Sequence, residues 1–360
     1  MNILYINNSM HLGGDNKCIL KLCKELKDEY KIVIASNGGI LESEFINLGI
    51  KHYYINNVVN KMPHTIISNV YKLIKIVKDE NIDIIHSHHR MATLISKIVS
   101  KFTGVRVIHT QHLCIEDKFK FTNIALNNTQ IIAVSNAAKR ILEIKSGLNI
   151  DKITIIYNTI ETEINNGIVD KKLIDLKEKG YFIVAQVSRV IDYKGVYDFV
   201  DIAKETIKEN NNIRFVFIGD GPEQDNLKLY IKEKNLEEYI YMLGSKDNVI
   251  EHLKYVDLVL LCSYIEGLPL APIEAFSQRI PVIATDIDGT NEEIIDGYNG
   301  YLVPAKDIEG FKQNILKIYK NPELLMKLKD NAYNIYMKNF NTKKYIDSHK
   351  EIYRQTKLGE

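Results

Sequence analysis

Apolar residues gather in short runs rich in isoleucine and valine, and stretches with the 3.6-residue periodicity of amphipathic helices separate most of these runs. Because the runs lack alternating polar residues, they are typical of strands buried on both faces of a parallel sheet. Seven runs come first: NILYIN, KIVIAS, KHYYI, IDIIHSH, RVIHTQH, TQIIAVS and KITIIYN. Six more follow: YFIVAQVSRV, IRFVFIGDG, YIYMLGS, LVLLCS, PVIATD and GYLVP. The pattern predicts an α/β protein with two doubly wound sheets.

A polar stretch at 158–172, NTIETEINNGIVDKK, separates the two series and reads as a linker. With 360 residues the chain is long enough for two domains of the usual size. We therefore expect domains at 1–165 and 166–340, with the helical C-terminal segment, about 341–360, packing back on the first. Ligands of such sheets bind beyond the carboxyl ends of the strands, so two facing domains would share a central cleft.

Charge differs between the two parts of the chain. Residues 1–165 hold 20 lysines and arginines against 15 acidic residues, whereas the whole chain has 47 against 46. A modest basic excess suggests an anionic ligand or membrane surface, although evenly solvated charge is a common cause. Lysines and arginines do not gather on one helix with interleaved aromatics, so no nucleic acid is expected.

The four cysteines form neither a metal-binding spacing nor a disulfide framework. The N-terminus lacks the features of a signal peptide, and no apolar run is long enough to span a bilayer. We expect a cytoplasmic protein with reduced thiols, which could rest peripherally on the inner face of the cell membrane.

The stretch SYIEGLPLAPIE follows a buried strand and leads into a helix. The first amides of a helix have no internal partner, so Pro269 and Pro272 are tolerated there and the remaining amides can bind ligand oxygens. Glu266 precedes this helix end, whereas Glu274 lies within the helix, where a buried charge needs a partner such as a ribose diol. The alternative is a helix cap with an ordinary surface acid.

Two further loops carry candidate residues, and each follows the first strand of one of the two series. In SRVIDYKG, Arg189 and Lys194 would place two cations at a sheet edge, as a diphosphate clamp requires, although such residues are often simply solvated. In MHLGGDNK, Gly13 and Gly14 allow a ligand to approach the backbone. This loop matches neither the dinucleotide nor the nucleoside triphosphate motif.

Histidines cluster at strand ends of the first domain, in IIHSHHR and IHTQHL. Imidazoles at these positions could orient hydroxyls or stabilise a leaving phosphate, although most are expected to satisfy internal hydrogen bonds. Because successive residues of a strand face opposite ways, HSHH is a poor metal-binding pattern. We expect no metal and no cofactor.

Taken in order, these stretches resemble the retaining family 4 glycosyltransferases, which have the GT-B fold. The resemblance covers nearly the whole chain. EGLPLAPIEA carries the family's pair of glutamates with seven residues between them, and PVIATDIDGTNEEIIDGYNGYLVP follows in the family's order. The family often has Gly-Phe-Gly after the first glutamate and Gly-Gly-x-Pro-Glu near 288–292, and these departures leave the donor sugar open.

The resemblance implies a catalytic role for Arg189, Lys194, Glu266 and His112. In this reading the two cations neutralise the donor diphosphate, Glu266 binds hydroxyls of the donor sugar, and His112 lies near its anomeric centre. Glu274 would hold the ribose. The other donor-binding positions implied are Gly13, Gly14, Gly244, Ser245, Gly267, Leu268 and Leu270, with the nucleotide base near 244 and 245.

The implied reaction transfers a hexose or N-acetylhexosamine, with retention, from a nucleoside diphosphate sugar to a glycan, lipid-linked or protein hydroxyl, with UDP as the expected nucleotide. Acceptor-side candidates are His86, His88 and Arg90. RMATLISKIVSKFTG from Arg90 and EDKFKF from Glu116 mix cations with apolar residues, as contact with an anionic membrane would require. A buried helix with lysines reaching water is an equally good interpretation. A nucleotide-sugar 2-epimerase of the same fold and a non-catalytic binding subunit stay open as alternatives.

Overall fold

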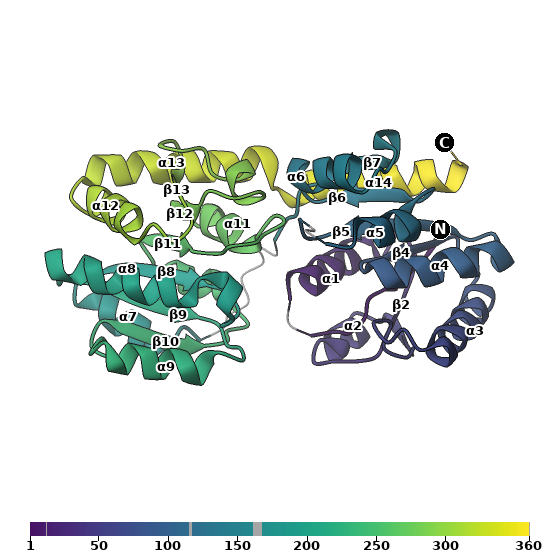
Figure 1. Cartoon of the computed structure of the whole chain (residues 1–360), viewed down its shortest axis with the longest axis horizontal. Coiled ribbons are helices and arrows are strands. Elements are labelled where there is room, and N and C mark those ends of the chain that lie inside the picture. Colours follow the sequence, from purple (N-terminus) through teal and green to yellow (C-terminus); the bar gives the residue numbers. More distant parts are fainter. Residues whose placement is uncertain (12, 115–116, 161–167, 360) are drawn as a thin grey trace. The chain divides into compact units, whose positions relative to one another are not determined.

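The computed structural model describes residues 1–11, 13–114, 117–160 and 168–359. Leu12 of the Gly-Gly stretch, Glu116 of the second basic apolar segment and linker residues 161–167 lie outside these ranges. The chain forms two compact units: unit 1 is Met1–Ile160 with Thr342–Glu360, and unit 2 is Glu161–Asn341. In Figure 1 unit 1 is purple to blue with a yellow C-terminal helix, and unit 2 is teal to yellow-green.

Unit 1 contains a parallel sheet of seven strands in the order β3-β2-β1-β4-β5-β6-β7. Its strands are β1 (Asn2–Ile6), β2 (Lys31–Ser36), β3 (Lys51–Tyr54), β4 (Ile84–Ser87), β5 (Arg106–Gln111), β6 (Gln130–Ala133) and β7 (Ile153–Ile155). Its helices are α1 (Gly14–Leu26), α2 (Glu42–Asn47), α3 (Pro63–Asp79), α4 (Arg90–Thr103), α5 (Phe119–Leu126), α6 (Asn136–Arg140) and α14 (Thr342–Leu358), with a π turn at Ile141–Lys145 and a 3₁₀ turn at Ile150–Lys152.

Both faces of this sheet are covered, which explains why its strands are apolar at successive positions. Ile3 and Tyr5 of β1 pack in one core with residues of α1, α2 and α14. Leu4 and Ile6 point the other way, into a core with residues of α3 and α4. Figure 1 shows α14, yellow, running beside the blue elements of unit 1. The last helix of the chain therefore completes the core around its first strand.

Unit 2 contains a parallel sheet of six strands in the order β10-β9-β8-β11-β12-β13. Its strands are β8 (Phe182–Val187), β9 (Ile213–Ile218), β10 (Ile240–Gly244), β11 (Leu258–Leu261), β12 (Val282–Thr285) and β13 (Gly300–Val303). Its helices are α7 (Lys171–Glu178), α8 (Val196–Glu209), α9 (Gln224–Glu233), α10 (Val249–Leu253), α11 (Leu270–Ser277), α12 (Ile308–Tyr319) and α13 (Pro322–Asn339), with 3₁₀ turns at Asp192–Lys194 and Thr290–Glu292. All thirteen predicted strands form, and the predicted fold class of two doubly wound parallel-sheet domains is confirmed.

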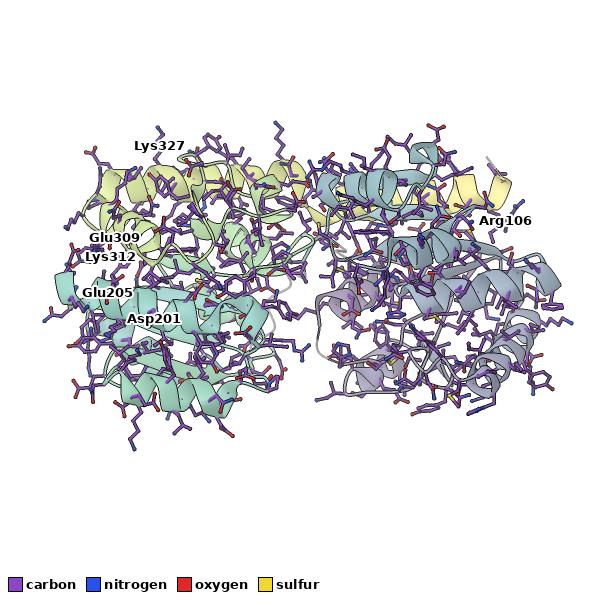
Figure 2. The ribbon with its side chains drawn as sticks, viewed as in Figure 1. Arg106, Asp201, Glu205, Glu309, Lys312 and Lys327 are labelled. Carbon is purple, nitrogen blue, oxygen red and sulfur yellow. The ribbon has the colours of Figure 1, made fainter. Side chains whose placement is uncertain are left out.

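Charged side chains on the outer helices of unit 2 pair with one another. Lys312 of α12 forms ion pairs with Glu309 at 2.9 Å and with Glu209 of α8 at 2.8 Å. Figure 2 labels Lys312 and Glu309 on α12 close to Glu205 on α8. Because Glu209 and Glu309 are both solvent-exposed, these pairs contribute little to stability. The apolar core beneath them, in which Phe199 of α8 contacts Phe215 and Phe217 of β9, holds these helices on the sheet.

Candidate functional site

The centre of the unit 2 sheet brings together loops that are far apart in the sequence. Because β8 lies between β9 and β11, the connections from β8 and β11 leave the sheet in different directions at its carboxyl edge. Such a reversal of strand order is where ligands of open α/β sheets bind. Lys194 follows β8 and Glu266 follows β11, so both lie at this edge.

Lys194 and Glu266 form a direct ion pair, in which Nζ donates to Oε1 at 2.5 Å. Their side chains are only 18% and 5% exposed. The family resemblance implies that the lysine binds a diphosphate and the acid binds sugar hydroxyls, and nothing in the sequence links the two residues. Since a lysine ammonium has three N–H donors, Lys194 can hold Glu266 in place and still donate to a phosphate oxygen.

The backbones of these two loops also touch. Gly195 has φ +64°, and a Cβ built on it would lie 2.0 Å from the carbonyl oxygen of Cys262. The amide of Tyr264 donates to the carbonyl of Tyr193 at 2.8 Å. The buried Gln186 donates from Nε2 to the carbonyl of Lys194, also at 2.8 Å. Glycine at 195 thus allows the close approach that places Lys194 beside Glu266.

Helix α11 begins at this edge. Its N-cap is Pro269, and no side chain caps it among the residues that the structure describes. Gly267 and Leu268 precede the helix, and Leu270 and Ala271 lie in its first turn, where amides have no partner within the helix. Glu274 is buried one turn later. The first turn of α11 therefore lies at this edge, and anion binding by its amides stays a prediction.

Three other predicted residues lie at the ends of nearby strands of this sheet. Arg189 is exposed in the same loop as Lys194. Gly244 ends β10 with φ +75°, and its carbonyl accepts from the amide of Gly219 after β9 at 2.9 Å. Ser245 next to it is exposed. These positions follow β8 and β10, the two strands that flank β9.

Glu293 is a feature of this site that the sequence analysis did not single out. The side chain is fully buried, and neither carboxyl oxygen has a hydrogen-bond partner among the described residues. Burial raises its pKa well above the usual range, and the charges of Glu266 and Glu292 raise it further. The preceding turn reaches the Glu266 loop, because a Cβ on Gly289 would lie 2.5 Å from the carbonyl oxygen of Gly267. The sequence does carry a signal for this burial, because Glu293 directly precedes the apolar pair Ile294–Ile295.

We predict that Glu293→Gln removes a pH dependence of stability. The unfolded chain loses this proton near the usual glutamate pKa, whereas the folded protein keeps it, so stability falls as pH rises above that value. The slope is about 1.4 kcal/mol per pH unit until the folded carboxyl ionises. Urea unfolding at pH 5 and pH 8 should show this decline in the wild type and in the exposed control Glu233→Gln, and a smaller one in Glu293→Gln. Equal slopes in all three proteins would contradict the assignment.

In unit 1, His86 is an internal residue. Its Nδ1 is 2.8 Å from the Tyr353 hydroxyl of α14, and its Nε2 is 2.7 Å from the Thr110 hydroxyl of β5. The Tyr353 hydroxyl also contacts that of Tyr5 at 2.8 Å. His86 is fully buried, so its ring lies out of direct reach of an acceptor, for which the sequence analysis proposed it. Its partners fix the position of α14 on the sheet.

His88 and His112 contact each other, although they come from different loops. Nδ1 of His88 is 2.8 Å from Nε2 of His112. His88 is 8% exposed, and His112 is partly exposed. Burial lowers the pKa of both imidazoles, and that of His88 falls well below its usual value. Both rings are therefore neutral at pH 7, and His112 is the one that reaches the surface.

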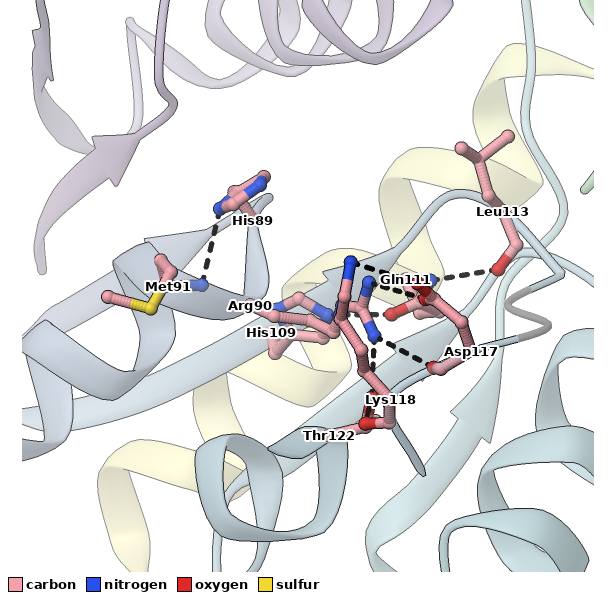
Figure 3. A network of polar contacts seen from close by, with 9 residues as sticks. All are labelled: His89, Arg90, Met91, His109, Gln111, Leu113, Asp117, Lys118 and Thr122. Atoms are coloured by element: carbon pink, nitrogen blue, oxygen red, sulfur yellow. Dashed lines mark hydrogen bonds and ion pairs between the residues drawn. The ribbon is translucent and has the colours of Figure 1, made fainter. Parts of the chain in front are cut away.

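Arg90 is held by its surroundings at the start of α4, as Figure 3 shows. Its Nη1 donates to the Thr122 hydroxyl at 2.7 Å, and Nη2 lies 3.7 Å from Asp117, which also pairs with Lys118. Figure 3 also shows His89, whose Nδ1 accepts from the Met91 amide and caps α4. Arg90 is half-buried, so an acceptor could contact only part of it.

Gly13 and Gly14 lie where β1 leads into α1, with Gly13 as the N-cap. The fully buried Asn16 fixes this loop, because its Nδ2 donates to the carbonyls of Ser9 and His11, both at 2.9 Å. Asn7 donates to Oδ1 of Asn16 at 2.7 Å. The side chains of Asn7 and Asn16 thus fix the backbone between β1 and α1.

The described residues contain no cluster of three or more histidine, cysteine, aspartate or glutamate side chains suited to a metal ion. All four cysteines are buried free thiols. Within the same ranges, no helix combines the length and apolarity needed to cross a membrane.

Comparison with known proteins agrees with this fold. Residues 170–335 match the family Glycosyl transferases group 1, and residues 12–164 match Glycosyltransferase Family 4. A similar protein is the UDP-Gal:alpha-D-GlcNAc-diphosphoundecaprenol alpha-1,3-galactosyltransferase of Escherichia coli, 29% identical over 79% of this chain and 78% of its own. The capsular polysaccharide biosynthesis glycosyltransferase CapH of Staphylococcus aureus is 29% identical over 81% of this chain and 83% of its own.

Among solved structures, Anabaena Alr3699/HepE in complex with UDP has a TM-score of 0.85, with 19% identity over 99% of this chain and 100% of that one. The two matched families, over 12–164 and 170–335, together with the two doubly wound sheets define a glycosyltransferase of the GT-B fold. Residues 12–164 belong to Glycosyltransferase Family 4, and residues 170–335 belong to Glycosyl transferases group 1.

Proposed function

We propose that the protein transfers a hexose or N-acetylhexosamine, with retention, from a UDP-sugar to a hydroxyl of a cell-surface glycan or its lipid-linked precursor. The observation that carries this proposal is the ion pair between the half-buried Lys194 and the buried Glu266, beside the N-terminus of α11. It joins a cation that suits a diphosphate to a carboxylate that suits sugar hydroxyls. The names of the similar E. coli and S. aureus enzymes support a UDP-sugar donor and a surface polysaccharide product.

In this proposal unit 2 binds the donor. Lys194, Arg189 and the first amides of α11 neutralise the negative charge that grows on the leaving diphosphate, which is the preorganised electrostatic stabilisation that transferases of phosphorylated donors need. Glu266 binds sugar hydroxyls, Glu274 binds the ribose, and Gly244 and Ser245 lie near the base. In unit 1, His112 contacts the donor sugar, and the Gly13–Gly14 backbone contacts phosphate.

The proposed mechanism needs no metal and no carboxylate nucleophile. Glu266 is engaged by Lys194, which makes it a poor nucleophile because its charge is already neutralised. We therefore propose a front-face reaction in which the leaving phosphate accepts the proton of the acceptor hydroxyl. The positive charge that a metal would supply comes from Lys194, Arg189 and the helix N-terminus.

The experiment is turnover of a panel of UDP-sugars with an extract of lipid-linked acceptors, with products identified by mass spectrometry. We expect UDP release that depends on acceptor, survives EDTA and gives an α-linkage from an α-linked donor, read from the anomeric proton coupling. Inversion of the linkage, loss of activity in EDTA or an epimerised donor sugar without acceptor would each contradict the proposal.

The acceptor side is proposed for unit 1. The outer face of α4 carries Phe102, which is 68% exposed, next to the exposed Lys101. An exposed aromatic ring beside a cation suits peripheral contact with an anionic leaflet that contains a lipid-linked acceptor. Flotation with anionic liposomes at low salt and its absence at high salt would support this contact, and no flotation at low salt would oppose it.

A further inference from the structure

The contact between His88 and His112 constrains where their protons lie. The Nδ1–Nε2 distance of 2.8 Å is that of a hydrogen bond, and the ring planes differ by 23° with centroids 5.1 Å apart, so the rings lie nearly edge to edge in one plane. Two neutral imidazoles carry one N–H each. The bond can form only if one proton lies between them, which leaves two arrangements.

In the first arrangement Nδ1–H of His88 donates to Nε2 of His112. Nε2 of His88 is then a bare acceptor, and His112 carries its own proton on Nδ1. In the second arrangement His112 donates from Nε2, so Nε2 of His88 must carry a proton and Nδ1 of His112 is bare. The buried Nε2 of His88 has no partner among the described residues, and a buried N–H without a partner is rarer in proteins than an acceptor without one. The first arrangement is favoured.

We propose that His88 is a positioning residue, which holds His112 in the tautomer that presents an Nδ1–H donor at the surface of unit 1. This inference rests on the proposed function, in which His112 contacts the donor sugar. It corrects the role that the sequence suggested for His88, because a ring that is 92% buried supports a neighbour better than it contacts an acceptor. An Nδ1–H donor binds a sugar oxygen that accepts a hydrogen bond, so this is the ligand group that the tautomer selects.

His88 is itself held from behind by ring contacts, and its neighbour His86 is fixed by hydrogen bonds. The ring centroid of His88 is 4.4 Å from that of His86, which is fixed by Tyr353 and Thr110. Tyr5 adds a second ring contact at 6.0 Å. The titratable groups that face the His88–His112 pair are His86, His109, His349, Tyr5 and Asp15. Among the residues that the structure describes, the charge of Asp15 favours the protonated form of His112, and burial outweighs it.

Two isosteric substitutions separate positioning from packing. In His88→Asn the amide nitrogen takes the place of Nδ1 and can donate to His112, whereas in His88→Gln it takes the place of Nε2 and cannot. We expect His88→Asn to keep kcat within about threefold of the wild type. We expect His88→Gln to lose about 10-fold to 100-fold, as when the hydrogen-bonded support of a functional histidine is removed. Equal loss in both variants would overturn the proposal.

The pH titration of His112 gives a readout that packing alone would not change. A hydrogen bond donated to Nε2 of His112 stabilises the neutral ring, so His88→Gln should raise the pKa of His112 toward its usual value of about 6.5. In the variant the ¹⁵N shifts of His112 should therefore titrate at a higher pH than in the wild type and in His88→Asn, whereas kcat is no readout of this step because the protonated ring keeps its Nδ1–H donor. An unchanged titration of His112 in His88→Gln would overturn the proposal.

The tautomer itself can be read without any assay of transfer. Long-range ¹H–¹⁵N spectra of full-length protein labelled with ¹⁵N-histidine, assigned with His88→Asn and His112→Asn, should show both rings protonated at Nδ1. A proton on Nε2 of His88 would overturn the proposal even if the enzyme is active. If the tautomers are as expected but no donor is turned over, the proposed function fails and the proton arrangement stands.

Discussion

Lys194→Ala should lower kcat about 10²-fold to 10³-fold, the loss expected when one preorganised donor to a developing negative charge is removed. The substitution also leaves Glu266 buried without its partner, and breaking a buried ion pair costs about 3–5 kcal/mol of unfolding free energy. Steady-state kinetics and urea unfolding of the same preparation separate the two effects. Turnover close to that of the wild type would contradict the proposed role of Lys194.

Two further variants complete this experiment. Lys194→Ala combined with Glu266→Gln should recover stability, because no buried charge is left unpaired, but should recover no activity. Lys208→Ala removes an exposed lysine that pairs with Glu205 on α8, and it should change the unfolding free energy by less than about 1 kcal/mol. A double variant as unstable as the single one would show that the cost of Lys194→Ala comes from lost packing.

Gly195→Ala should destabilise unit 2 by about 3 kcal/mol or more, at the high end for a single substitution. Position 195 combines positive φ with a Cβ only 2.0 Å from the carbonyl oxygen of Cys262, so the two loops must move apart. That movement separates Lys194 from Glu266. We therefore expect kcat to fall under conditions in which the variant is still folded, as followed by circular dichroism.

Gly180→Ala is the matched control. Gly180 has φ +79°, and nothing lies within 4 Å of a Cβ built on it. The two substitutions share the cost of about 1–2 kcal/mol for a left-handed residue with a side chain. The difference between them isolates the contact with Cys262. Equal destabilisation by both, with equal activity, would contradict the importance of the close approach.

The strands could be predicted from the sequence because burial on both faces of a parallel sheet leaves a local signal. Ile3 and Leu4 are adjacent apolar residues that enter different cores, so the run NILYIN has no polar alternation. The place of Lys194, Glu266 and the start of α11 at strand ends follows from the same signal. Chain topology then brings strand ends to one edge.

Side-chain partners could not be predicted, since they depend on contacts between distant segments. The Lys194–Glu266 bond joins residues 72 positions apart, and the His86–Tyr353 contact joins residues 267 positions apart. A histidine at a strand end looks the same in the sequence whether it faces a ligand or a tyrosine of the last helix. The raised pKa of Glu293 likewise depends on burial that three-dimensional packing alone creates.

The central claim is that cations and helix amides of unit 2 bind the diphosphate of a nucleotide sugar. Calorimetric titration of the full-length protein with UDP, UMP and uridine tests it most directly. The account predicts that UDP binds more tightly than UMP and UMP more tightly than uridine, and that Lys194→Ala and Arg189→Ala remove most of the difference between UDP and UMP. Equal affinity for the three ligands, or an undiminished preference for UDP in both variants, would contradict the account.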